Sequence, residues 1–275
     1  DERNHSLFHS LTQKVVNRIL EIELQRGDSE TQVTRLAEEL HRVYGAETLI
    51  RILQAFGKDT FIRDSYNWRN TKRGVLSSLL HACYPSPDDD SDTLKSLASQ
   101  ADISHIRLVE AAMFAPQWLE LTEKATGWKG LESAAYYFHA HTSECFDDKK
   151  KAIIARYTPI AIEDLQEGAF DIDWFKEAYK AIGKERFEVV YNAAKYISSS
   201  NTHTRARKFA DAVNGKTKAA DAKKEIIAKR NKDLLMSYGL IPLGRKADKE
   251  LLERYQFLQK FLKESKEFGA QRQES

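Results

Sequence analysis

Apolar residues recur every three or four positions along almost the whole chain, which is the period of an amphipathic helix. The pattern begins with Leu7, Leu11, Val15, Ile19 and Ile22, which we expect on one buried face. The chain has only 12 Gly and 5 Pro in 275 residues, fewer turn residues than an all-β protein of this size needs. The sequence therefore predicts an all-α protein.

Gly, Pro or a capping residue separates the periodic runs, each about 10–16 residues long. Asn70 or Thr71, Asp92 and Ser104 are candidate caps at helix starts, and Gly57 and Gly127 are candidate helix ends. Short helices joined by short turns are typical of helical pairs that stack on their neighbours. No repeat of fixed period is visible, so we expect a HEAT-like or armadillo-like α-solenoid in architecture only.

The segment most suited to a domain boundary is residues 85–92, an acidic loop of low complexity that contains two prolines. We predict an N-terminal helical subdomain over 1–84, a central helical-repeat region over 93–215 and basic C-terminal long helices over 216–275. Gly27 is expected to end the first helix, and a second helix, starting at a Thr31 cap, is expected to run to Val43.

The C-terminal region is expected to end in two long, exposed helices. The first covers residues 217–237, which are dense in Lys, Ala and Asp, and residues 239–244 form an apolar kink after it. The last, over about 247–268, is expected to group its apolar residues on one face: Leu251, Leu252, Tyr255, Leu258, Phe261 and Leu262.

Charge is unevenly distributed between the two parts of the chain. Residues 201–275 hold 18 Lys and Arg against 10 Asp and Glu, whereas residues 1–200 hold 25 against 31. Clustered cations release counterions from phosphates and bind polyanions without regard to sequence. The segment 205–232 is therefore a candidate polyanion-binding site, with these contacts: Arg205, Arg207, Lys208, Lys223, Lys224, Lys229 and Arg230. Intervening carboxylates leave a lysine-rich solvated helix as the competing interpretation.

Other candidates for chemistry have a structural explanation that fits better. His139 and His141 would point about 200° apart on a helix, so we expect one surface and one core-edge histidine rather than a metal pair. Asp88–Asp92 lacks the glycine and glutamate of a calcium loop, so we expect a solvated acidic loop. Asp171 and Asp173 suit a helix start, where they cap backbone amides. Residues 136–138, Tyr-Tyr-Phe, are expected in the core.

We find no phosphate-binding glycine loop, serine nucleophile elbow or kinase signature, so no catalytic residue, metal or cofactor is predicted. Two distant cysteines, Cys83 and Cys145, indicate a reducing compartment. The N-terminal residues lack the apolar region of a signal peptide, and no apolar run approaches the roughly 20 residues of a membrane span. We therefore expect a cytoplasmic protein without membrane contact. The chain does not begin with Met, and we expect it to be a piece of a longer protein.

Several uncommon strings occur in order over residues 100–275: Ala-Ala-Met-Phe-Ala-Pro-Gln-Trp-Leu at 111–119, Gly-Ala-Phe-Asp-Ile-Asp-Trp-Phe at 168–175, and shorter ones at 194–197, 229–235, 238–243, 254–258, 261–266 and 268–273. With these strings the chain resembles a large, mostly bacterial family of uncharacterised proteins that includes those labelled molybdate metabolism regulators. The resemblance implies an internal helical region, often followed by a further domain and a WGR module linked to nucleic-acid-associated proteins. It implies no catalytic residue, and the strings themselves are expected to be packing surfaces.

Three functions remain open from the sequence. The first is a non-catalytic helical scaffold or interaction region of a larger regulatory protein, with a protein partner or the remainder of a longer chain as its partner. The second is a nucleic-acid-binding region that uses the segment 205–232. The third is an enzyme whose site is assembled from distant residues such as His139, Asp171 or Asp173.

Overall fold

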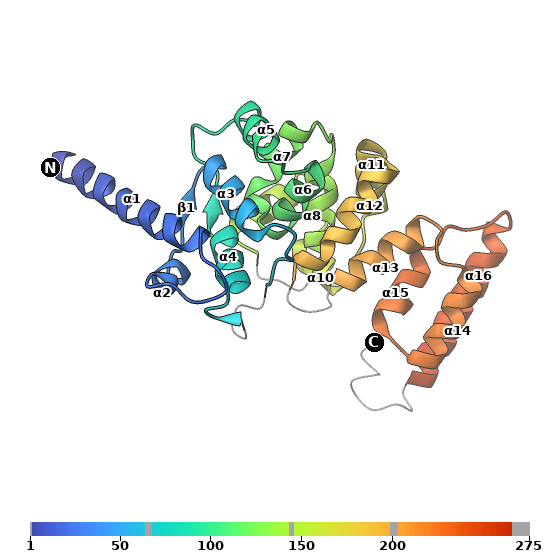
Figure 1. Ribbon diagram of the computed structural model, residues 1–275. Coiled ribbons are helices and arrows are strands. Elements are labelled where there is room, and N and C mark those ends of the chain that lie inside the picture. Colours follow the sequence, from blue (N-terminus) through green and yellow to red (C-terminus); the bar gives the residue numbers. More distant parts are fainter. Residues whose placement is uncertain (1, 64–67, 143–145, 199–202, 266–275) are drawn as a thin grey trace. The chain divides into compact units, whose positions relative to one another are not determined.

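The computed structural model describes residues 2–63, 68–142, 146–198 and 203–265, and the side chains from Ser10 onward. Over these residues the chain forms sixteen α-helices, two short 3-10 helices (η2 and η3) and one pair of two-residue strands (Figure 1). The prediction of an all-α, helical-repeat protein is confirmed.

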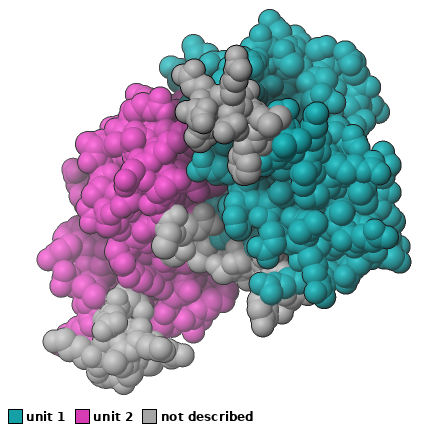
Figure 2. All heavy atoms as spheres, turned by 90° about the vertical axis from the view of Figure 1, so that its left-hand side faces the viewer, with its two compact units in different colours: residues 1–135, 178–201 teal, residues 136–177, 202–275 magenta. Residues whose placement is uncertain are grey.

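The chain groups into two compact units, coloured separately in Figure 2: unit 1 contains residues 1–135 and 178–201, and unit 2 contains residues 136–177 and 202–275. Each unit draws on two separate stretches of sequence. The three expected segments, 1–84, 93–215 and 216–275, were defined by an acidic loop and by charge, whereas the two units are defined by packing. The three segments therefore stay a prediction.

Unit 1 is built mainly from the N-terminal helices. Its elements are α1 (Glu2–Leu24), α2 (Thr34–Glu38), β1 (Val43–Tyr44), α3 (Ala46–Phe56), α4 (Lys72–His81), β2 (Cys83–Tyr84), α5 (Ser91–Gln100), α6 (His105–Phe114), η2 (Pro116–Trp118), α7 (Leu119–Thr126), α12 (Lys184–Ala193) and η3 (Ala194–Tyr196). Two further helices, α8 (Leu131–Ala140) and α11 (Ile172–Ile182), span the division between the units.

Most helices of unit 1 pack on helices that are close to them in the chain, as expected of a helical array, and α6 also packs on the distant α12. α3 packs on α4 and α5, α5 on α7, and α6 on α7 and α12. The buried indole of Trp118 donates a hydrogen bond from Nε1 to the carbonyl oxygen of Cys83 at 2.7 Å. This bond joins the turn at η2 to β2, which pairs in parallel with β1.

Local capping signals mostly place the helix ends correctly. The Thr71 hydroxyl accepts a bond from the Gly74 amide at 3.1 Å, and Ser104 accepts one from Arg107 at 3.2 Å. Gly57 and Gly127 follow α3 and α7 with positive φ angles of 54° and 67°. The cap of α5 is Asp90 rather than Asp92, because Ser91 already belongs to the helix.

The helix expected from Thr31 to Val43 is wrong. Only Thr34–Glu38 is helical, and Val33, at its start, supplies no side-chain cap. Val43 instead pairs with Cys83 in the small sheet. Thr31 points its hydroxyl to the buried carboxylate of Glu23 at 2.7 Å, so its oxygen serves a tertiary contact.

The inward face predicted for the first helix is also wrong at Leu11 and Val15, and the side chain of Leu7 lies outside the described residues. Leu11 and Val15 are 52% and 59% exposed, whereas Ile19 is buried. α1 packs on α2 and α3. Burial begins only where the helix meets the body of unit 1.

Unit 2 contains α9 (Asp148–Ile154), α10 (Ile162–Glu167), α13 (His203–Val213), α14 (Ala219–Lys229), α15 (Lys232–Leu240) and α16 (Ala247–Ser265). The long helix expected over 217–237 is two helices. Arg230 adopts a left-handed φ of 45°, and Asn231 caps α15 by accepting a bond from the Leu234 amide at 3.1 Å. The kink expected over 239–244 separates α15 from α16, which runs for 19 residues.

Among the residues that the structure describes, no helix combines the length and apolar character that crossing a bilayer needs.

Candidate interaction site on the C-terminal helices

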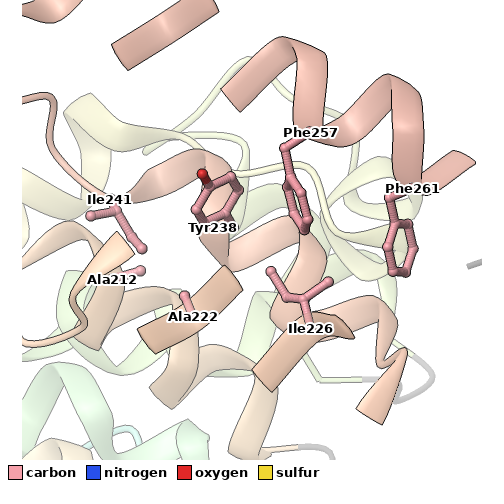
Figure 3. Packing of buried hydrophobic residues seen from close by; sticks show 7 residues of the cluster. All are labelled: Ala212, Ala222, Ile226, Tyr238, Ile241, Phe257 and Phe261. Carbon is pink, nitrogen blue, oxygen red and sulfur yellow. The ribbon is translucent and has the colours of Figure 1, made fainter. Parts of the chain in front are cut away.

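A small hydrophobic cluster joins α13, α14, α15 and α16 in unit 2. Its members lie on all four helices or the α15–α16 connection: Ala212, Ala222, Ile226, Tyr238, Ile241, Phe257 and Phe261. Figure 3 shows Phe257 and Phe261 extending from α16 toward the residues of α14 and α15. The rings of Tyr238 and Phe257 lie 5.4 Å apart in an edge-on arrangement. This cluster fixes which face of α16 turns inward.

Arg254 holds the α15–α16 connection from inside. Its side chain is buried, and it donates hydrogen bonds to the carbonyl oxygens of Tyr238 at 3.3 Å, Ile241 at 2.6 Å and Pro242 at 3.3 Å. Nη2 also donates to Glu250 at 2.5 Å. The last carbonyls of a helix lack partners within the helix, and a guanidinium can satisfy several of them at once.

Arg230, between α14 and α15, makes similar contacts with the C-terminal end of α16. Its guanidinium lies 4.1 Å from the centre of the Phe261 ring and donates to the Phe261 carbonyl oxygen at 3.4 Å and to the Ser265 hydroxyl. The Ser265 hydroxyl donates in turn to the Phe261 carbonyl oxygen at 2.7 Å. The break between α14 and α15 is therefore fastened to the end of α16.

The face of α16 that turns inward is only part of its apolar arc. Arg254, Phe257, Phe261 and Ser265 are buried. The apolar residues beside them are exposed: Leu251 at 57%, Leu252 at 56%, Tyr255 at 59% and Leu262 at 48%. The single apolar face expected from the sequence is thus split, with Phe261 inside and most of the leucines outside.

The exposed residues follow a regular spacing. Leu251, Tyr255, Leu258 and Leu262 are separated by four, three and four residues, which is the spacing of a coiled-coil seam. Leu258 is partly buried against the hydrophobic cluster, so the seam is continuous with the core of unit 2. We call these four residues the apolar seam.

The seven predicted polyanion contacts do not form one surface. Arg205, on α13, is engaged internally: Nε lies 2.7 Å from Asp233 Oδ1, and Nη1 donates to the Gln166 carbonyl oxygen. Arg207 and Lys208 are half-buried on the same helix. Arg230 fastens α16, as described above. Lys223, Lys224 and Lys229 are exposed on α14, and Lys229 pairs with Glu225.

Lys223 also lines a groove that the sequence segment 205–232 did not predict. The groove lies between α14 and α16 and has a volume of about 480 Å³. We call it the lysine groove, and its lining is Ala219, Ala220, Lys223, Tyr238, Lys246, Lys249, Glu250, Glu253 and Arg254. Lys246 and Lys249 lie outside the basic segment in sequence, so only the packing of α16 on α14 brings them to Lys223.

His139 and His141 are both buried, so the expectation of one surface histidine is wrong. His141 lies among aromatic rings, 4.7 Å from Tyr137 and 5.4 Å from Phe170. Its Nδ1 is 2.8 Å from the Tyr137 carbonyl oxygen. Burial lowers the pKa of His141 to about 4, against backbone hydrogen bonding that raises it. The ring is therefore neutral near pH 7.

Of the two aspartates expected to cap a helix, only Asp171 is the cap. Asp171 caps α11, with Oδ1 accepting bonds from the amides of Asp173 and Trp174 at 3.0 Å each and Oδ2 accepting one from Thr158 at 2.7 Å. Asp173 lies in the first turn. In the acidic loop, Asp89 accepts bonds from the Ala46 and Ser86 amides, so part of this loop is structural. Cys83 is a buried free thiol, and Cys145 lies outside the described residues.

The uncommon strings of the sequence carry these same contacts. Trp118, Asp171, Arg230 and Arg254 each belong to one of the strings and each bonds backbone or caps a helix. Tyr137 and Phe138, from the aromatic run, are buried as expected.

Within unit 2, the C-terminal helices form a packed array, as in a helical-repeat protein. The array has an exposed apolar seam and a cationic groove. The chain belongs to DUF5724, a family of unknown function, whose model matches residues 1–275. The match extends beyond residues 100–275, over which the resemblance to a family was seen, and it names neither molybdate metabolism nor a WGR module. No curated protein and no solved structure matches the chain.

Proposed function

We propose that this chain is a non-catalytic helical scaffold within a larger regulatory protein, and that the apolar seam of α16 binds a helix. The observation that carries the proposal is the exposure of Leu251, Tyr255 and Leu262 at coiled-coil spacing. The bound helix would belong to a partner protein or to further residues of a longer chain. The family strings support this function, since their residues are used in packing and capping.

The seam is large enough to matter in binding. Complete burial of a Leu or Tyr side chain contributes about 1.5–3 kcal/mol, so four half-exposed side chains, counting Leu252, would contribute roughly 3–6 kcal/mol. A matching seam on the bound helix adds a similar amount. Association costs about 4–15 kcal/mol, so two such seams offset a cost in the lower half of that range.

The resemblance to proteins labelled molybdate metabolism regulators supports the regulatory part of this proposal. A cytoplasmic location belongs to the same proposal, and its support is the low cysteine content.

Site-specific photo-crosslinking tests the seam directly. A benzophenone amino acid replaces Tyr255 or Leu262 in the protein expressed in its own cells, and in matched controls it replaces Gln256 or Lys260 on the opposite side of α16. We expect crosslinks to a helix at the seam positions and none at the controls. Equal crosslinking at all four positions, or none at the seam, would refute the proposal. A crosslink between two copies of this chain would identify self-association.

The alternative function is nucleic-acid binding through the segment 205–232, and its support is the exposure of Lys223, Lys224 and Lys229 on α14. Fluorescence anisotropy with duplex and single-stranded DNA and RNA, from low to high salt, tests it. Binding that weakens steeply with salt and disappears when all three lysines are changed to Glu would favour this function over the scaffold. No binding at low salt would remove it.

A further inference from the structure

The lysine groove concentrates positive charge that its own carboxylates do not neutralise. Arg254 is matched by Glu250 at 2.5 Å, and Lys249 lies 3.8 Å from Glu253. Lys223 and Lys246 form no ion pair among the residues that the structure describes. The Lys223 ammonium lies 4.9 Å from the centre of the Phe257 ring, which holds the side chain over the α14–α16 contact. Two of the cations at the groove are thus left for an anion.

The wall formed by α14 is open to a ligand. Lys218 precedes this 11-residue helix and supplies no side-chain cap. Ala219 and Ala220, the first two residues of the helix, line the groove. The N-terminal end of a helix carries partial positive charge, which attracts an anion. This feature adds to the charge of the lysines, which come from α14, from the first turn of α16 and from the residue just before α16.

The size and surroundings of the groove favour a small anion over a nucleic-acid strand. Its volume of about 480 Å³ lies within the range of small-ligand sites. A strand needs a continuous cationic track. Outside the groove, exposed lysines alternate with carboxylates: Lys229 pairs with Glu225, and Lys260 lies 3.6 Å from Glu264.

We propose that the lysine groove binds a small phosphate-bearing ligand, with the phosphate held by Lys223, Lys246 and Lys249. This inference does not rest on the proposed scaffold function. Lys249 and Leu251 are two residues apart, so their side chains point about 200° apart on α16. A ligand in the groove and a helix on the apolar seam can therefore be bound independently.

The test is calorimetric titration of the 275-residue protein with inorganic pyrophosphate at low salt. The groove variant changes Lys223, Lys246 and Lys249 to Ala. The matched control changes Lys224, Lys260 and Lys263 to Ala, which removes the same charge from α14 and α16 outside the groove. We expect the groove variant to bind pyrophosphate at least tenfold more weakly and the control to stay within twofold of the original protein. No binding by the original protein, or equal losses in both variants, would overturn the inference.

Two further measurements make the result independent of variant folding and of the ligand's source. In the unaltered protein, pyrophosphate should slow acetylation of Lys246 and Lys249, measured by mass spectrometry, without slowing that of Lys260. A single-stranded oligonucleotide with dephosphorylated ends is titrated in parallel, and we expect it not to compete with pyrophosphate. If it protects Lys224 and Lys260 as strongly as the groove lysines, the site is a general polyanion surface and the inference fails.

Discussion

Replacing Arg254 by Met should release the α15–α16 connection. The side chain is 5% exposed and bonds three carbonyl oxygens, one at 2.6 Å and two at 3.3 Å. A hydrogen bond from a charged donor contributes about 1.5–3 kcal/mol, and the two longer bonds contribute less. We leave out the contact with Glu250, whose side chain reaches solvent. The expected loss of stability is therefore about 3 kcal/mol.

Hydrogen exchange read by mass spectrometry on peptides of α15 and α16 measures this loss where it occurs. The amides of both helices should exchange faster by a factor of about 100, corresponding to about 3 kcal/mol. Arg245→Met, at an exposed position in the same connection, is the matched control and should change the opening free energy by less than about 0.5 kcal/mol. Arg254→Lys should lose most of the same stability, since an ammonium cannot reach the three carbonyls as a fork. An Arg254→Met protein with unchanged exchange would refute the reasoning.

Three further predictions concern the interior. Since burial lowers the pKa of His141 to about 4, the folded protein favours the neutral ring; stability should be full above about pH 6.5 and fall by about 3 kcal/mol as the pH drops toward 4. Urea unfolding across this pH range measures the loss of stability, and His141→Phe should remove the part of the pH dependence that comes from His141. Arg26 forms a fully buried pair with Glu23 at 2.6 Å, so Arg26→Met should cost about 3–5 kcal/mol in urea titrations. Gly168 has a φ of 117° and an added Cβ would clash with the Met236 sulfur, so Gly168→Ala should lower the free energy of unfolding by about 1–3 kcal/mol in urea titrations, whereas Gly239→Ala, with open space around it, should not lower it.

Helix ends were predictable because their signals are local. Thr71 and Ser104 accept bonds from amides three residues ahead, so the capping residue and its donors lie in one short string. Where two acidic residues compete, the string is ambiguous: Asp90 caps instead of Asp92, and Asp171 instead of Asp173. Sequence sets the cap to within about two residues.

The arginine hydrogen bonds that hold the helices of unit 2 together could not be predicted from the sequence. Arg254 bonds carbonyl oxygens 12 to 16 residues away, and every residue has such an acceptor. For the same reason, Arg205 and Arg230 were predicted to bind a polyanion because they lie in a basic segment, whereas in the structure their donors bond to other parts of the fold. The lysine groove escaped for the same reason, because Lys246 and Lys249 join Lys223 only when α16 packs on α14.

The remaining discrepancy is the one that bears on function. Periodicity identified an apolar arc on α1, which was expected to be buried, and one on α16, a helix expected to be mostly exposed. Leu11 and Val15 on α1 are exposed, as are Leu251 and Leu262 on α16, whereas Phe261 is buried. Periodicity reports how wide an apolar arc is, and only packing reports how much of it the chain itself covers. On α1 the uncovered part is two described side chains, which are ordinary on a protein surface. On α16 three exposed residues, Leu251, Tyr255 and Leu262, stand at coiled-coil spacing with the partly buried Leu258, which adjoins the buried cluster, so a second helix could extend the same core without rearranging it.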